Sequence, residues 1–276
     1  MQNLSKLDRP EICSRLFSPP QSYKGNCPTN AEDIVLNICE GVHLTCRFYL
    51  AALDAPTLIY FHGGAESSDS FDLEAESYIQ VGINVFLTSL RGFGKSTGVP
   101  LVSVLLVDAG LQFLQASEWL RGRNCSGAII VMGRSLGVVC AIDVVNNNQD
   151  RIKAMILESA FCDTLPLLTA MGIETFADFS EDQGFNNVLK ITEIKVPTMI
   201  FHGSRDVLVP ISQAEKLQAA SGAKNKQFLV IPGAGHDNVW KTGGSLYFKT
   251  IKGFVDTVCG INTWRQRRRK FKNDQD

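Results

Sequence analysis

Short apolar runs recur along the chain from residue 57 onward, and each is followed by a longer stretch with the apolar spacing of a helix. Short continuous apolar runs are typical of strands buried on both faces of a sheet, whereas longer amphipathic stretches indicate helices. The predicted strands cover residues 57–61, 84–90, 128–132, 152–157, 197–201 and 227–231. The predicted helices cover residues 69–81, 102–121, 136–146, 211–220 and 246–258. This alternation predicts an α/β fold with a mainly parallel central sheet and helices on both faces.

The first part of the chain lacks this rhythm. Residues 33–39 and 43–50 alternate imperfectly between apolar and polar positions, with Glu40-Gly41 between them, which predicts a β-hairpin at an antiparallel edge of the sheet. Residues 1–30 are rich in proline, and prolines at that density interrupt regular structure. We therefore expect residues 1–30 to form an extended lead-in that wraps the main domain.

Residues 161–190 form a long stretch without a predicted strand. Loops of that length inside a compact domain are usually functional, so this insertion is interpreted as a small cap over an apolar pocket. A helical crossover that binds no ligand is the alternative. The sequence thus predicts one α/β domain over residues 31–260, which includes the cap, followed by a basic tail over residues 261–276.

Composition and charge narrow the class of partner. The chain has 276 residues, of which 45% are hydrophobic, and that is enough for a substantial core. Charged residues make up 20% and the formal net charge is −1, so the overall charge does not favour nucleic acid or a membrane as the main partner. For the basic tail, a weak contact with an anionic surface is the minor alternative to a solvated end.

The eight cysteines favour a reducing compartment. None forms a C-x-x-C pair, so no zinc or thioredoxin-like site is indicated, and cysteines inside apolar runs are typical of buried thiols. The N-terminus lacks the apolar core of a signal peptide, and no run approaches the roughly twenty apolar residues of a membrane span. We expect a soluble, cytoplasmic protein with reduced cysteines.

The candidate nucleophile lies in the string G-R-S-L-G at residues 133–137. The string follows a predicted strand and opens a predicted helix, which is the context that a G-x-S-x-G nucleophile requires. In such a turn the flanking glycines let strand and helix approach, and the Ser135 hydroxyl points out at the carboxyl end of the sheet. The N–H of Leu136 then lies at the helix start, in position to bind an oxyanion. An ordinary glycine–serine turn is the alternative.

A second oxyanion-binding group is predicted in the string H-G-G-A at residues 62–65, which follows the first buried strand. Glycines at the end of a strand let backbone N–H groups turn inward, so the N–H of Gly64 or of Ala65 would supply the second donor. Taken alone, the string would indicate an ordinary turn. His62 is interpreted as a structural histidine that fixes this loop.

His236 is the candidate general base among four histidines. His43 lies in the first hairpin, and both His62 and His202 end a strand and precede a glycine. His236 instead lies in the glycine-rich loop after the last strand, residues 232–238. We expect that loop to give the ring the freedom to move against the serine.

Asp206 is the candidate acid that orients the imidazole. It follows the predicted strand 197–201 and so lies at the carboxyl end of the sheet. Glu158 and Asp163, which follow the preceding strand, are the competing carboxylates, and a carboxylate at a helix start is the structural alternative for Asp206. Asp237 is too close in sequence to its neighbour to reach round to the ring.

Together these strings resemble the α/β-hydrolase superfamily, and within it the serine aminopeptidase-like (peptidase S33-like) and lid-poor esterase or thioesterase branch. The matching strings are Y-F-H-G-G at 60–64, R-G-F-G-K-S at 91–96, G-R-S-L-G at 133–137, H-G-S-R-D at 202–206 and G-H at 235–236. They cover residues 33–258, with Ser135, Asp206 and His236 in the chain order of nucleophile, acid and base for this fold. The resemblance implies a catalytic triad and an oxyanion hole, and it implies neither a metal nor an organic cofactor.

The residues and the resemblance predict hydrolysis of a carboxylic ester or thioester through an acyl-serine, with a small-molecule substrate that has a small or medium apolar acyl group. An aminopeptidase or amidase of the same fold is one alternative, and Glu174, Glu181 and Asp182 are its candidates for binding a peptide amino terminus. A non-catalytic member that binds a ligand or partner is the other, disfavoured because every triad position is filled.

Overall fold

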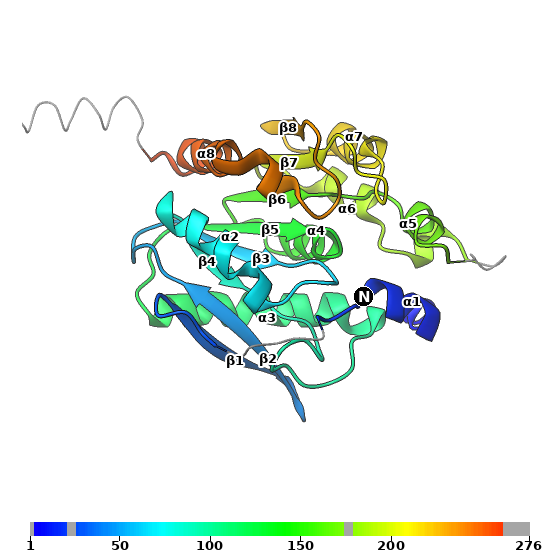
Figure 1. Ribbon diagram of the computed structural model, residues 1–276, viewed down its shortest axis with the longest axis horizontal. Helices are drawn as coiled ribbons and strands as arrows, with labels where there is room; N and C mark the ends of the chain where they lie inside the picture. The colour runs from blue at the N-terminus through cyan, green and yellow to red at the C-terminus, as the bar shows by residue number, and fades with distance from the viewer. Residues whose placement is uncertain (1–2, 21–25, 174–178, 262–276) are drawn as a thin grey trace, which may run out of the picture.

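The computed structural model describes residues 3–20, 26–173 and 179–261, and an eight-stranded sheet organises them in the order β1-β2-β4-β3-β5-β6-β7-β8 (Figure 1). The strands are β1 Ala31–Cys39, β2 Val42–Tyr49, β3 Thr57–Phe61, β4 Asn84–Leu87, β5 Ile129–Arg134, β6 Ala154–Glu158, β7 Thr198–Gly203 and β8 Lys226–Ile231. The strands from β3 to β8 run parallel, whereas β2 pairs antiparallel with both β1 and β4. The predicted fold class, with a hairpin at an antiparallel edge, is confirmed.

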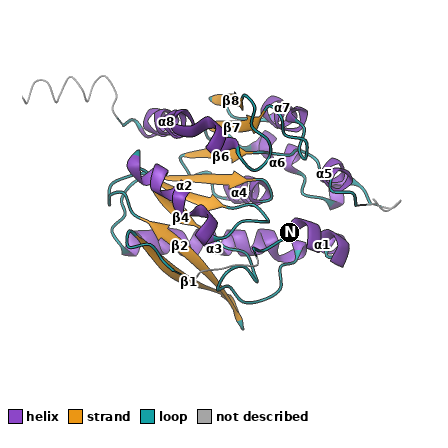
Figure 2. Cartoon of the chain, in the orientation of Figure 1, coloured by secondary structure: helices purple, strands orange, loops and turns teal. Residues whose placement is uncertain are grey.

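Helices cover both faces of this sheet (Figure 2). They are α1 Pro10–Leu16, α2 Ser68–Gln80, α3 Val102–Gly122, α4 Gly137–Asn147, α5 Thr164–Ala170, α6 Asn187–Glu193, α7 Ile211–Ala220 and α8 Val239–Cys259, with 3-10 turns η1 Ser5–Leu7 and η2 Glu181–Gln183. Buried side chains of α2 and α8 pack on one face. Those of α3, α4, α6 and α7 pack on the other, so the sheet has an apolar layer on each side.

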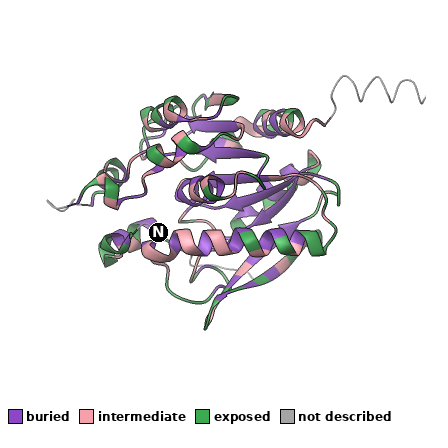
Figure 3. Ribbon diagram, turned by 180° about the vertical axis from the view of Figure 1, so that it is seen from behind, coloured by how far each residue is buried: buried purple, intermediate pink, exposed green. Residues whose placement is uncertain are grey.

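The apolar runs of the sequence follow from this layering. In β3, Ile59 packs into the layer below α3 and α4, while its neighbours Leu58 and Tyr60 pack into the layer below α2 and α8. Successive side chains of a strand point to opposite faces, so a strand covered on both faces must be apolar throughout. Figure 3 shows the result, with buried strands inside and exposed residues on the outer faces of the helices.

The N-terminal segment is not extended as the sequence predicted, because it contains helix α1. Pro10 occupies the first turn of α1, where a proline's missing N–H is no loss and its fixed φ suits a helix. Ile12 and Leu16 are four residues apart and both buried, so one face of α1 joins the core below α3. The prediction counted every proline as an interruption of regular structure, although Pro10 begins helix α1.

The insertion after β6 forms α5, η2 and α6 before the chain enters β7. Its side chains Leu168 and Phe185 are fully buried in the main core, so this segment is continuous with the body of the molecule. Glu181 accepts hydrogen bonds from the N–H and hydroxyl of Thr164, which ties η2 to the start of α5. The Lys6 ammonium also donates to Gln183, so the N-terminal segment contacts the insertion.

Three further expectations concern the basic tail, membrane-spanning segments and the cysteines. The basic tail predicted over residues 261–276 lies outside the described residues, apart from Ile261. Within the described part of the chain, no helix combines the length and the apolar character needed to cross a membrane. All eight cysteines are described, and each carries a free thiol.

Candidate active site

Ser135 sits in a sharp turn between β5 and α4, and its backbone adopts a left-handed φ of 51°. A non-glycine residue rarely takes that conformation, and such strain is typical of the nucleophile turn of G-x-S-x-G proteins. A Cβ at Gly133 would lie 2.4 Å from the carbonyl oxygen of Gly137, and one at Gly137 would lie 2.0 Å from that of Phe61. Both glycines are therefore needed for the close approach of strand and helix.

The structure brings Ser135, His236 and Asp206 into one hydrogen-bonded chain. The Ser135 Oγ lies 2.8 Å from His236 Nε2, and His236 Nδ1 lies 2.8 Å from Asp206 Oδ2. The Asp206 carboxylate is completely buried, whereas the His236 side chain retains 8% exposure. A serine, an imidazole and a buried carboxylate in this relation form the geometry of a nucleophile, its base and the group that orients the base.

The carboxylate of Asp206 fixes the tautomer of His236. A carboxylate oxygen accepts a hydrogen bond from Nδ1–H, so Nε2 keeps its lone pair and accepts a hydrogen bond from the Ser135 hydroxyl. Burial lowers the pKa of His236, but the hydrogen bond and the charge of Asp206 outweigh burial and leave the pKa above its ordinary value. The imidazolium that forms when the base takes a proton is thereby stabilised.

Asp206 is itself held by backbone donors. Its Oδ1 accepts hydrogen bonds from the N–H groups of Leu208 at 3.1 Å and Val209 at 2.8 Å, which leaves Oδ2 for the histidine. The ring of His202 lies beside it and donates from Nε2 to the carbonyl oxygen of Val209, 2.8 Å away. Burial lowers the pKa of His202, so the ring that lies beside Asp206 is the neutral imidazole.

The loop that carries His236 is anchored, contrary to the freedom expected from its glycines. The Ser159 hydroxyl donates to the carbonyl oxygen of His236 at 2.8 Å, and the N–H of Gly235 donates to the Asn238 side chain at 2.7 Å. The N–H of Arg205 adds a bond to the loop carbonyl of Ala234 at 2.8 Å. The candidate base, His236, is thus held in place by the protein itself.

Ser159 was not predicted from the sequence. It follows β6 as Ser135 follows β5, and it has the same left-handed φ of 51°. Its N–H donates to Phe201 in the next strand, and its hydroxyl holds the histidine loop. The only sequence signal was a serine directly after a buried strand, which marks the same sheet edge as the nucleophile.

The competing carboxylates point elsewhere. Glu158 accepts hydrogen bonds from the Arg134 guanidinium and from the Tyr247 hydroxyl, on the side of the sheet that α8 covers. Asp163 pairs with Lys216 of α7. Neither carboxylate is hydrogen-bonded to His236, which leaves Asp206 as the described acid on that ring.

The candidate oxyanion donors lie around the nucleophile. A Cβ at Gly63 would lie 3.5 Å from the Cβ of Ser135, and one at Gly64 would lie 3.4 Å from the Leu136 side chain, so this loop packs directly on the turn. Within the described part of the chain, the N–H groups of Leu136, Gly64 and Ala65 donate to no other group. His62 is buried and donates from Nδ1 to the carbonyl oxygen of Gly63 at 2.7 Å, which fixes the loop.

The acidic residues considered for a peptide amino terminus are otherwise engaged. Glu181 binds the N–H groups of Thr164 and Leu165, and Asp182 accepts a hydrogen bond from Ser180. Glu174, the third of these candidates, lies outside the described residues. The insertion therefore offers no described carboxylate pair that is free to bind an ammonium group beside Ser135.

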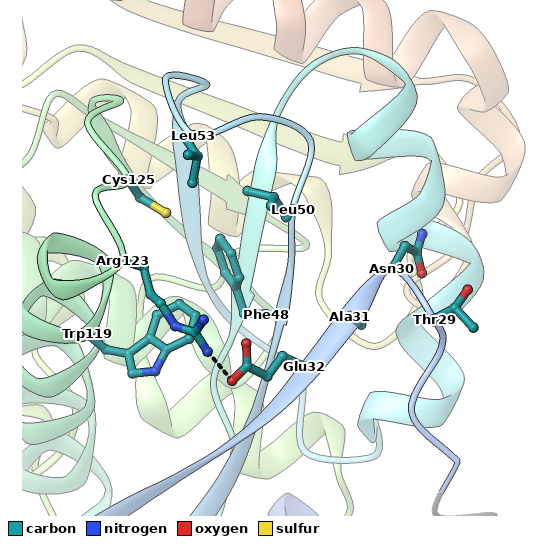
Figure 4. Close-up of a pocket in the computed structure, with 10 residues that line it drawn as sticks. All are labelled: Thr29, Asn30, Ala31, Glu32, Phe48, Leu50, Leu53, Trp119, Arg123 and Cys125. Atoms are coloured by element: carbon teal, nitrogen blue, oxygen red, sulfur yellow. Dashed lines mark hydrogen bonds and ion pairs between the residues drawn. The ribbon is translucent and has the colours of Figure 1, made fainter.

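A surface pocket of about 330 Å³ lies at the opposite end of the sheet (Figure 4). Phe48, Leu50, Leu53 and Trp119 form its apolar wall, and Arg123 lies over the Trp119 ring while pairing with Glu32. None of the triad residues lines it. This pocket is therefore separate from the candidate site around Ser135.

Sheet order, nucleophile turn and the position of the serine–histidine–aspartate chain define an α/β-hydrolase. The family model described as serine aminopeptidase, S33, matches residues 54–181 and 183–240, which is more than half of the chain. The chain belongs to this family. The matched ranges include Ser135, Asp206 and His236.

Curated relatives match most of the chain. The protein bem46 of Schizosaccharomyces pombe is 32% identical over 253 residues, which cover 86% of this chain and 82% of the relative. The alpha/beta hydrolase domain-containing protein WAV2 of Arabidopsis thaliana is 29% identical over 245 residues, which cover 82% of this chain and 78% of the relative.

Solved structures of esterases share the fold. The esterase Pf2001 of Pyrococcus furiosus superposes with a TM-score of 0.71 at 20% identity, over 87% of this chain and 98% of that chain. Est1E of Butyrivibrio proteoclasticus, with ferulic acid bound, superposes with a TM-score of 0.64 at 19% identity, over 80% of this chain and 97% of that chain. Family and fold together make this protein a hydrolase.

Proposed function

We propose that the protein is a serine esterase or thioesterase that forms an acyl-enzyme on Ser135. One observation carries the proposal: the unbroken chain from Ser135 Oγ through His236 to the buried carboxylate of Asp206, with 2.8 Å at each step. This is the distance at which a general base takes a hydroxyl proton. The structural neighbour from Pyrococcus furiosus is an esterase, which supports the same class of substrate.

In the first half of the reaction, His236 Nε2 takes the Ser135 proton while Oγ bonds to the carbonyl carbon. The carbonyl electron pair moves onto oxygen, and the N–H of Leu136 together with that of Gly64 or Ala65 binds this oxyanion. When the oxyanion collapses, the C–O or C–S bond to the leaving group breaks. The leaving group takes the proton from Nε2 and departs as an alcohol or thiol.

In the second half, a water molecule attacks the acyl carbon and gives its proton to His236 Nε2. The second tetrahedral intermediate uses the same N–H donors, and its collapse returns the proton to Ser135 Oγ. The products are a carboxylic acid and the free enzyme. Every proton in the cycle passes through one imidazole, whose orientation Asp206 fixes.

A panel of p-nitrophenyl esters and acyl thioesters tests this function directly. The wild-type chain should hydrolyse short members of the panel, and Ser135→Ala should lose turnover while circular dichroism shows a retained fold. Ser103→Ala changes a serine at the start of α3 whose described hydrogen bond runs from its N–H to Asp8, and as the control it should keep full turnover. A Ser135→Ala chain that hydrolyses the panel at the wild-type rate would overturn the proposal.

A further inference from the structure

A buried arginine lies directly beneath the nucleophile. Arg134 is the residue before Ser135, and its side chain is only 5% exposed. Its guanidinium contacts three carboxylates: Glu66 from Nη1 at 2.7 Å, Glu158 from Nε at 2.7 Å, and Glu74 from Nη2. A buried charge is stable only when it is paired and hydrogen-bonded, and a forked guanidinium can serve several acceptors at fixed angles.

The three carboxylates differ in what else they hold. Glu158 has a second partner in the Tyr247 hydroxyl, on α8, and Glu74 lies on α2 with Arg134 as its described partner. Glu66 instead lies in the loop after H-G-G-A, and its Oε2 accepts the N–H of Gly63 at 2.6 Å. Of the three, Glu66 alone connects the guanidinium to the backbone of the candidate oxyanion loop.

This connection joins two parts of the site that are far apart in sequence. Arg134 is covalently attached to Ser135, and Glu66 bridges it to Gly63, next to the candidate donors of Gly64 and Ala65. The Arg134–Glu66 bridge therefore links the nucleophile to the loop that carries the candidate donors. Gly63 also lies next to the nucleophile itself, since a Cβ added to it would lie 3.5 Å from the Cβ of Ser135.

The charges support an ion pair at this bridge. Burial raises the pKa of Glu66, but the charges of Arg134 and His62, together with the hydrogen bonds from Arg134 and from Gly63 N–H, outweigh burial and bring the pKa below its ordinary value, so Glu66 is ionised at neutral pH. Burial raises the pKa of Glu74 to about 8, so Glu74 is mostly protonated at neutral pH. The guanidinium thus pairs with Glu66 and is only hydrogen-bonded to Glu74.

We propose that Arg134 and Glu66 are positioning residues that set the distance between Ser135 and the oxyanion donors of the H-G-G-A loop. This inference rests on the proposed acyl-serine function. Oxyanion donors act only when they lie about 2.7–3.1 Å from the developing charge. A displaced loop therefore weakens binding of the transition state more than binding of the substrate, which lowers kcat and leaves KM unchanged.

A matched pair of glutamine variants tests the proposal. In Glu66→Gln the amide has one acceptor oxygen, so its nitrogen must face either Gly63 N–H or Arg134, both of which are donors. In Glu74→Gln the single described contact with Arg134 survives. We expect Glu66→Gln to lower kcat on a p-nitrophenyl ester by about ten- to a hundredfold at unchanged KM, and Glu74→Gln to leave kcat unchanged at neutral pH.

Two further variants complete the test. Arg134→Lys removes the forked guanidinium and should lower kcat as Glu66→Gln does. The double variant should lose no more kcat than the more strongly affected single variant, because both substitutions break the same bridge. Glu66→Asp, which keeps the charge but shortens the reach to Gly63, replaces Glu66→Gln if that chain does not fold. The same kcat loss is expected from it.

The outcomes separate the two proposals. A wild-type chain that hydrolyses esters, together with a Glu66→Gln chain of unchanged kcat, overturns the positioning role alone. Equal losses in Glu66→Gln and Glu74→Gln, or a change confined to KM, also overturn it. A wild-type chain that neither turns over esters nor reacts at Ser135 with a fluorophosphonate overturns the function on which the inference rests.

Discussion

Single residues around His236 decide how the base works. The two oxygens of Asp206 divide their tasks, since one accepts backbone N–H groups and the other accepts His236 Nδ1–H. The backbone bonds hold the carboxylate still, so the imidazole is oriented by a group that cannot rotate away. We therefore expect Asp206 to be the residue of the site most sensitive to substitution after Ser135 and His236 themselves.

Asp206→Asn is expected to lower kcat by about 10³–10⁴ while the fold is kept. The one acceptor oxygen of the amide is held by the N–H groups of Leu208 and Val209, and the amide nitrogen cannot accept a hydrogen bond from Nδ1–H, so the ring turns or changes tautomer and no longer accepts from Ser135. Steady-state hydrolysis of a p-nitrophenyl ester measures the loss. Asp163→Asn is the control. Asp163 pairs with Lys216, so its substitution should leave kcat unchanged. A mild Asp206→Asn beside a severe Glu158→Gln would mean that the acid is wrongly assigned.

The pH dependence of kcat/KM follows from the same contact. The base must be neutral, and its pKa lies above the ordinary value because Asp206 outweighs burial. Activity should therefore increase as the pH rises through that pKa. In Asp206→Asn the pKa of His236 is lower, so the residual activity should begin to increase at a lower pH than in the wild type. A profile of kcat/KM for both chains between about pH 5 and 9 measures the two limbs. An acid limb that moves to higher pH in the variant would contradict this account.

Glu74 gives a separate prediction about stability. Its pKa is raised by burial from an ordinary 4.5 to about 8, so between these values the folded state holds a proton that the unfolded state has released. The free energy of unfolding must then fall as pH rises, by up to about 1.4 kcal/mol per pH unit. Glu74→Gln removes this slope. Urea denaturation of both chains at about pH 5.5 and about pH 7.5 compares them, and parallel losses in stability would be inconsistent with a buried protonated Glu74.

At the scale of elements, α1 is part of the site's support. The N–H of Ser18, just after α1, donates to the carbonyl oxygen of Gly64 at 2.7 Å. A Cβ on Gly64 would lie 1.7 Å from the carbonyl oxygen of Leu16, the last residue of α1. The N-terminal segment thus packs against the candidate oxyanion loop so closely that only glycine fits between them.

Gly64→Ala should therefore destabilise the protein and displace α1. The clash involves backbone on both sides, so no side-chain rotation relieves it. Gly110→Ala is the matched control, since a Cβ there meets nothing within 4 Å and alanine in a helix is favoured by roughly 0.5–1 kcal/mol. Thermal denaturation should show a lower Tm for the first variant and a higher one for the second. Equal Tm values would mean that α1 is not held against this loop.

The sequence was sufficient for elements whose signal is local. The apolar run of β3 predicted its bounds, Thr57–Phe61, and G-R-S-L-G predicted the turn after β5. The prediction from sequence was wrong where one residue type has two structural roles. Proline interrupts regular structure but also begins helices, as Pro10 begins α1. It also placed the last helix at 246–258, whereas α8 begins at Val239 and passes through a non-helical Gly244.

The three triad residues were within reach of the sequence because each lies in a motif directly after a strand. The Arg134 bridge was not, because its carboxylates come from a loop, from α2 and from the end of β6. Only the folded topology brings these three segments to one guanidinium. The rigidity of the His236 loop likewise depends on Ser159, a contact across 77 residues of sequence.

At the scale of the whole molecule, we expect the insertion after β6 to limit the size of the substrate. Its side chains Leu168 and Phe185 are committed to the main core, and α5 and α6 have only seven residues each. We expect so compact a segment to cover a shallow acyl pocket beside Ser135 and not to build a deep tunnel. The substrate preference should therefore be set by short acyl groups.

We expect kcat/KM on p-nitrophenyl esters to rise with acyl length and to stop rising at about four to eight carbons, because each methylene adds about 0.8 kcal/mol only while it finds pocket wall. A series from acetyl to palmitoyl esters measures this. Continued increase up to palmitoyl would contradict a shallow pocket. Cleavage of aminoacyl amides with no action on esters would instead favour the aminopeptidase alternative.

The central claim, an acyl-enzyme on Ser135, is tested most directly by a fluorophosphonate probe followed by mass spectrometry of the intact chain and its peptides. The serine oxygen should displace fluoride and add one phosphonyl group per chain, on the peptide that contains Ser135. Ser135→Ala should carry no adduct. Ser159, the other serine with a left-handed backbone at this sheet edge, should stay unmodified. An adduct on Ser159, or an unchanged adduct in Ser135→Ala, would contradict the account.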